Sequence, residues 1–134
     1  MKTISSSIFS NCNALSEVII PEGVETIGDF AFEWCVALEE IALPSTLKNI
    51  GIFAFSGCTA LENIVIPNSV ESIGGGAFSK CTALSQVTFE EGGEAGLRLE
   101  TIPEDADLNG HMDSEGVFYQ CTAMTSISLP SRTE

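Results

Sequence analysis

The chain has 134 residues, of which 44% are apolar, and its 19 acidic and 5 basic residues give a net charge of −14. This length favours one domain with enough apolar residues for a core, and the acidic excess repels nucleic-acid phosphates and anionic lipid surfaces, so we exclude both as partners. No segment reaches the roughly 20 consecutive apolar residues that a transmembrane helix needs, which also excludes membrane insertion.

The N-terminal residues already belong to a repeating pattern and lack the apolar run of a signal peptide. The chain stops just after a predicted strand, and neither end has the polar capping unit that repeat arrays usually require. We therefore expect a fragment of a longer protein, with its targeting signals outside this chain.

A period of 23 residues runs through the chain, and Cys12, Cys35, Cys58 and Cys81 mark it. Apolar residues recur in step with these cysteines. One such unit cannot bury its own apolar side, so neighbouring units must stack into a continuous core. The apolar columns are Ile4, Ile27, Ile50, Ile73 and Ile102; Phe9, Phe32, Phe55, Phe78 and Phe118; Leu15, Leu38, Leu61, Leu84 and Met124; Val18, Ile41, Ile64, Val87 and Ile127; and Ile20, Leu43, Ile66, Phe89 and Leu129.

Two insertions interrupt the period late in the chain. Cys121 follows Cys81 by 40 residues, which is 17 more than the period. The extra residues fall within 90–98 and 103–116, and insertions of this kind map to loops on one face of a solenoid. The predicted repeats are 4–26, 27–49, 50–72, 73–101 and 102–131 of a single domain spanning residues 1–134.

Each repeat predicts one coil with two extended segments. In the second repeat, residues 38–43 end in an alternation of inward and outward side chains, which predicts a short strand, and Pro44 ends its pairing because proline has no N–H. Residues 47–50 form a second extended or turn segment, Gly51 permits a tight corner, and residues 53–58 return as a compact or single helical turn. Parallel pairing of successive coils at about 4.8 Å gives a mostly β repeat solenoid of about five coils.

The repeated pattern I-G-x-x-A-F-x-x-C-x-A-L-x-x-I-x-I-P-x-x-V is clearest in residues 27–49 and 50–72. It resembles the BspA-like, or Treponema pallidum-type, leucine-rich repeat over nearly the whole chain. The chain departs from the pattern at Glu90 in place of proline, at Pro103 in place of glycine, and at Val117 in place of alanine. The resemblance implies a curved right-handed superhelix with a sheet on its concave side. It also implies frequent occurrence in surface and secreted proteins of bacteria, and of some protozoa, that bind host or matrix proteins.

The cysteines share one column and should therefore point inward. Equivalent residues of adjacent coils lie about 5 Å apart, but their side chains point in parallel rather than toward one another. The C-x2-C spacing of a zinc site is absent. We expect all five cysteines to be reduced and buried as small apolar residues.

Nothing in the sequence forms a catalytic constellation. His111 is the only histidine, and no Ser-His-Asp, Cys-His or paired-carboxylate arrangement can be argued from it. The glycines at 74–76 lack the strand and helix that flank a phosphate-binding loop. We expect no enzymatic activity.

The second insertion contains a pattern that resembles the start of a calcium loop, with Gly110 at the sixth position, where the bend needs glycine. The bidentate glutamate of such a loop belongs at position twelve, which is Gly116 here. We expect an acidic solvated loop and no cofactor, with calcium binding as the alternative. The calcium ligands would then be Asp105, Asp107, Asn109, Asp113 and Glu115.

The outward positions of the main strands form two ladders on the expected concave face. They contain no aromatic residue and no arginine, the residues that most often anchor interfaces. If the domain binds a protein, we expect contact through Glu17, Glu40, Asn63, Gln86 and Ser126 in one ladder and through Ile19, Ala42, Val65, Thr88 and Ser128 in the other.

These observations favour a non-catalytic protein-binding module of a bacterial cell-surface or secreted protein, with adhesion or host and matrix interaction as its role. This expectation depends on the resemblance. The alternative is a structural spacer or stalk in a multidomain surface protein. Charge reversal at Glu40 or a charge placed at Gln86 should weaken a binding face and should leave a spacer unaffected.

Overall fold

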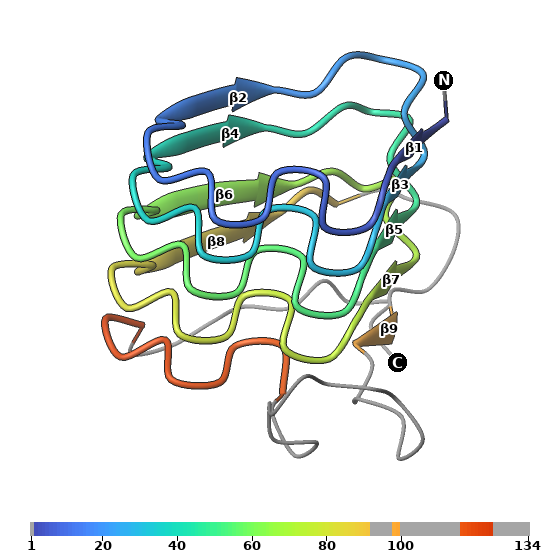
Figure 1. Ribbon diagram of the computed structural model, residues 1–134. Coiled ribbons are helices and arrows are strands. Elements are labelled where there is room, and N and C mark those ends of the chain that lie inside the picture. The colour runs from blue at the N-terminus through green and yellow to red at the C-terminus, as the bar shows by residue number, and fades with distance from the viewer. Residues whose placement is uncertain (1, 92–97, 100–115, 125–134) are drawn as a thin grey trace.

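The structure, a computed structural model, describes residues 2–91 and 116–124 and the backbone of residues 98–99. The chain winds into a stack of coils, with strands on two sides of the stack (Figure 1). One side is a five-stranded sheet of β1 (Thr3–Ile4), β3 (Thr26–Ile27), β5 (Asn49–Ile50), β7 (Ser72–Ile73) and β9 (Arg98–Leu99). The other side holds two separate pairs, β2 (Glu17–Ile19) with β4 (Glu40–Ala42) and β6 (Asn63–Ile66) with β8 (Gln86–Phe89).

The strands pair in parallel and in the predicted 23-residue register, with Ile4 beside Ile27, Ile50 beside Ile73, and Val18 beside Ile41. Identical residue types therefore stack at the same place in successive coils, and each coil buries the apolar side of its neighbours. This confirms the predicted repeat solenoid. Its central core residues are at most 2% exposed and include Ile27, Leu38, Ile50, Leu61, Ile73 and Leu84.

The predicted fifth member of the isoleucine column is wrong. Leu99, rather than Ile102, pairs with Ile73. Both Arg98-Leu99 and Thr101-Ile102 place a polar residue before an aliphatic one, so both segments fit the column by residue type, and strand pairing selects the earlier one. The column therefore continues three residues earlier than predicted, and Ile102 lies outside the described residues.

Turns connect the strands, and the described part of the chain contains no helix. Each turn is closed by hydrogen bonds between residues three apart, such as Cys35 N–H to Phe32 O at 3.3 Å. Each turn also bonds to the next coil, as Phe32 N–H does to Ala54 O at 2.8 Å. The compact return segment predicted for residues 53–58 is thus built from turns, whose backbone groups are satisfied by the neighbouring coil. No described helix is long and apolar enough to cross a bilayer.

The phenylalanine column forms a continuous stack of rings. The ring centroids of Phe9 and Phe32, Phe32 and Phe55, and Phe55 and Phe78 lie 5.2, 5.2 and 5.3 Å apart, and Phe78 lies 5.7 Å from Phe118. The planes of Phe32 and Phe55 differ by only 2°. Phe55 is completely buried, whereas Phe9 in the first coil is 37% exposed.

All five cysteines are free thiols, as predicted, and four are buried. The predicted burial is wrong for Cys12, which is only half-buried because the first coil has a neighbour on one side. The buried thiols donate hydrogen bonds to phenylalanine carbonyls one coil back, as from Cys58 Sγ to Phe32 O at 3.3 Å and from Cys81 Sγ to Phe55 O at 3.1 Å. The column therefore combines small apolar volume with a weak donor for a buried carbonyl.

Glycines in two columns make room for aromatic rings. A Cβ atom on Gly57 would overlap the Trp34 ring of the preceding coil, and one on Gly76 would overlap the Phe53 ring. Both glycines also have a positive φ, which glycine adopts without steric cost. On the far side of Gly57, the Lys80 ammonium lies 5.9 Å from the Trp34 ring centroid.

Candidate functional site

The side of the stack that carries β2, β4, β6 and β8 presents two ladders of outward side chains. Parallel pairing places Glu17 beside Glu40 and Asn63 beside Gln86, while Ile19 lies beside Ala42. These ladder positions are exposed, and Ile19 and Val65 are 74% and 50% exposed. The described ladder residues are Glu17, Ile19, Glu40, Ala42, Asn63, Val65, Gln86 and Thr88, whereas Ser126 and Ser128 lie outside the described residues.

Strand pairing on this side is interrupted between β4 and β6. The neighbouring pairs are joined by bonds such as Ile20 N–H to Ala42 O at 3.0 Å and Ser85 N–H to Glu62 O at 3.0 Å. Among the described residues, the equivalent bonds across the boundary between β4 and β6 are not formed: Leu43 N–H makes none to the β6 coil, and Glu62 N–H makes none to the β4 coil. A groove of about 570 Å³ runs along this interruption.

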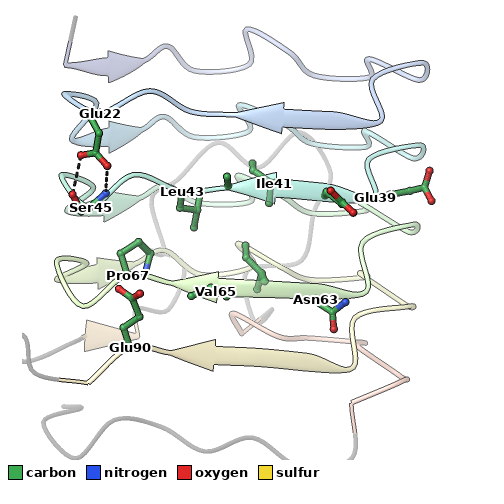
Figure 2. Close-up of a pocket in the computed structure, with 12 residues that line it drawn as sticks. Glu22, Glu39, Ile41, Leu43, Ser45, Asn63, Val65, Pro67 and Glu90 are labelled. Carbon is green, nitrogen blue, oxygen red and sulfur yellow. Dashed lines mark hydrogen bonds between the residues drawn. The ribbon is translucent and has the colours of Figure 1, made fainter.

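The floor of the groove is apolar. Figure 2 shows Ile41 and Leu43 from the β4 coil opposite Val65 and Pro67 from the β6 coil. Ile64 and Ile66 of β6 are 2% and 1% exposed, whereas Ile41 and Leu43 are only half-buried. The β4 residues are therefore left partly uncovered where β6 does not pair with them.

Carboxylates flank both ends of this floor. Glu22 and Glu90 lie toward one end and Glu39 toward the other (Figure 2), and Glu40 also lines the groove. No basic residue appears among the described lining residues. The rim therefore carries negative charge around an apolar strip.

Two of these carboxylates are held by the adjacent coil. Glu22 accepts hydrogen bonds from Ser45 N–H at 3.0 Å and from Ser45 Oγ at 2.8 Å. Both hydrogen bonds stabilise the carboxylate and therefore lower the pKa of Glu22 below its ordinary value. The backbone bond makes the larger contribution and the hydroxyl bond the smaller one. Glu90 accepts a hydrogen bond from Asn68 N–H at 3.3 Å.

Sequence reasoning found the ladder residues but missed Glu22 and Glu90 as groove residues. Both follow the strands, at turn positions outside the alternating pattern. The available signal was Glu90 itself, which stands where the other repeats have proline. Its backbone N–H bonds to Ile66 O at 3.0 Å, a bond that proline cannot make.

Two of the described lysines are paired with acidic residues of the following coil, away from the groove. Lys2 Nζ lies 3.3 Å from Glu25, and Lys48 Nζ lies 3.6 Å from Glu71. Both ion pairs are well exposed, so they contribute little to stability. Both ion pairs lie beside the coils of the five-stranded sheet, so neither of these lysines neutralises the described carboxylates of the groove rim.

The described residues offer little for metal or nucleophilic chemistry. They contain no group of three potential metal-binding side chains. Burial raises the pKa of Cys35 and raises that of Cys121 to about 12, while the hydrogen bond with Cys81, followed by burial, raises the pKa of Cys58. These thiols are therefore protonated at neutral pH and are poor nucleophiles. The candidate calcium ligands Asp105, Asp107, Asn109, Asp113 and Glu115 lie outside the described residues.

Comparison with protein families and solved structures gives a consistent result. A family model described as the BspA type leucine rich repeat region (6 copies) matches residues 1–106. A leucine-rich cell surface protein from Faecalibacterium prausnitzii is 28% identical with a TM-score of 0.75, and the match covers 98% of this chain and 30% of that protein. No curated protein matches the chain as a relative.

Two further solved structures are similar. The leucine-rich repeat protein of T. pallidum is 26% identical with a TM-score of 0.62, over 98% of this chain and 64% of that protein. A leucine-rich repeat protein from Bacteroides ovatus is 29% identical with a TM-score of 0.59, over 100% of this chain and 36% of that protein. The chain thus spans about a third of the length of two of these proteins and just under two thirds of the other.

Proposed function

Because the chain belongs to the BspA-type leucine-rich repeat family, we propose that it is a non-catalytic protein-binding module of a bacterial cell-surface or secreted protein. Its role is adhesion through contact with host or matrix proteins. The similar protein from F. prausnitzii is described as a cell surface protein, which supports this location. The binding surface is the side of the stack formed by β2, β4, β6 and β8.

The observation that carries the proposal is the combination of exposed apolar side chains and a groove on one sheet face. Ile19 and Val65 are strongly exposed, whereas the isoleucines of the opposite sheet, Ile27, Ile50 and Ile73, are at most 2% exposed. The groove of about 570 Å³ lies between β4 and β6, and Val65 lines it. Apolar groups exposed beside polar ones on a regular surface are typical of protein-interaction sites.

A structural spacer is the second candidate, and the coverage of the similar proteins favours it. This chain matches 30% and 36% of two longer repeat proteins, so its coils could serve as one section of a long stack. In such arrays each coil contacts only its neighbours, and length can be added without a new core. A spacer needs no particular side chain at the ladder positions.

Binding to a panel of purified extracellular-matrix proteins, measured by surface plasmon resonance, separates these candidates. Glu40→Lys and Gln86→Lys each change the charge of the exposed face without disturbing a buried residue. Glu71→Lys is the matched control, because it reverses a charge beside the five-stranded sheet.

A binding module should lose at least about tenfold in affinity with either face variant and keep its affinity with Glu71→Lys. Unchanged melting temperatures would confirm that each variant is folded. Equal binding by all three variants, or no binding to any protein in the panel, would favour the spacer.

A further inference from the structure

Building on the proposed function, we infer that the groove between β4 and β6 binds an extended peptide segment of a partner protein, with apolar side chains at its centre and lysine or arginine at its ends. The groove residues Ile41, Leu43 and Val65 supply the floor, and Glu22, Glu39 and Glu90 supply the charged ends. The groove is therefore the part of the face that recognises this segment.

The first argument is shape. The groove follows the direction of the strands, because it lies along the line where β4 and β6 fail to pair. From Glu39 to Ser45 the lining extends over a length that an extended peptide of about seven residues spans, at about 3.3 Å per residue. A long narrow site of this kind accommodates a strand-like segment better than a compact small molecule.

The second argument is the chemistry of the floor. Val65 is 50% exposed, and Ile41 and Leu43 are half-buried beside the unpaired boundary between β4 and β6. Covering these side chains removes apolar surface from water, which favours binding. In an extended segment alternate residues face one side, so two or three apolar side chains of the partner can enter the groove together.

The third argument is charge complementarity. Four carboxylates line the groove, from Glu22, Glu39, Glu40 and Glu90, and no described lining residue is basic. The two Ser45 hydrogen bonds keep Glu22 oriented and favour its ionised form. Cationic ends on the partner segment meet these carboxylates, whereas an acidic segment is repelled.

The same charge argues against other occupants. A second copy of this chain brings a net charge of −14 and the same acidic rim, so its groove face would repel this one. Like-charge repulsion also disfavours phosphorylated and other anionic ligands. A basic, apolar segment is the occupant that fits both the floor and the rim.

The test uses a fluorescently labelled seven-residue peptide with two lysines at each end of a Leu-Val-Leu centre, both termini blocked, titrated with the whole chain by fluorescence anisotropy. Two control peptides replace the four lysines with glutamate or the Leu-Val-Leu centre with three serines. We expect saturable 1:1 binding of the first peptide only. Raising the salt from 0.1 M to 1 M should weaken it severalfold, because the Debye length falls from about 10 Å to about 3 Å.

Matched variants locate the site. Val65→Ser should weaken peptide binding by at least about fivefold, whereas Val36→Ser, at a similarly exposed valine outside the groove, should change it less than about twofold. Glu39→Lys combined with Glu90→Lys should weaken binding by about tenfold or more, and Glu62→Lys combined with Glu71→Lys should have a much smaller effect. Melting temperatures check that each variant is folded.

The outcomes separate this inference from the proposed function. Equal loss with the groove variants and their controls indicates binding to overall negative charge and overturns the inference. No peptide binding, or association of the chain with itself through the groove in sedimentation velocity, also overturns it. If matrix proteins bind and respond to Gln86→Lys, which lies outside the groove, but not to Val65→Ser, the face is a binding surface and only the groove assignment fails.

Discussion

Replacing Phe55 with alanine should lower the free energy of unfolding by about 4 kcal/mol, within the range of about 3–5 kcal/mol for such a truncation in a core. A loss within this range is expected because Phe55 is completely buried and stacks on Phe32 and Phe78, at 5.2 and 5.3 Å. Each aromatic pair contributes roughly 0.5–1.5 kcal/mol beyond area burial. Phe55→Leu, which keeps most of the apolar volume, should cost about 1–2 kcal/mol.

Phe9 provides the matched control, because it belongs to the same column but is 37% exposed and stacks on Phe32 alone. Phe9→Ala should therefore cost roughly half as much, about 2 kcal/mol. Urea unfolding followed by circular dichroism and fluorescence gives both values, and coincident transitions test whether unfolding is two-state. Equal losses at Phe9 and Phe55 would refute the argument that each coil is stabilised by its immediate neighbours.

Cys58→Ala should cost about 1–2 kcal/mol, as a small cavity and a lost weak hydrogen bond imply, and mass analysis without reductant should find every cysteine unlinked; a disulfide between neighbouring coils would contradict the parallel arrangement. Gly57→Ala should destabilise the fold by at least about 1 kcal/mol, because the added Cβ meets the Trp34 ring at a positive φ. Combining it with Trp34→Ala should restore part of that loss in a double-mutant cycle, and additive effects would refute the steric explanation. Millimolar calcium should leave the melting temperature unchanged; a rise that Asp105→Ala with Asp107→Ala abolishes would establish the alternative of a calcium loop.

The 23-residue period was sufficient to predict the stacking, the parallel register and the inward columns. Cys35 recurs at Cys58 and Cys81, each time three residues after a phenylalanine and three residues before a leucine, and identical side chains can share one column only if the coils are equivalent. The outward ladder positions, such as Glu40 and Asn63, followed from the same alternation and are exposed. Local pattern and stacking therefore agree in this part of the chain.

Predictions from the 23-residue period were wrong or incomplete where insertions interrupt the period, and where coils with the same residue pattern differ in strand pairing. Leu99 and Ile102 both fit the isoleucine column by type, and only strand pairing distinguishes them. The groove could not be predicted, because β4 and β6 have the same pattern as strands that do pair. The groove follows from the missing hydrogen bonds between β4 and β6, which the repeated residue pattern does not distinguish from the bonds of the other coils.

Because the Trp34 ring packs against Gly57 of the following coil, these two coils cannot be exchanged for other coils independently. An in-frame deletion of residues 50–72 would keep the period intact but bring Lys80 to the position that Gly57 now occupies. The indole would then meet a side chain where it needs an empty site. Recombination within an array of this kind is therefore restricted to exchanges that move a tryptophan-bearing coil together with the glycine-bearing coil that follows it.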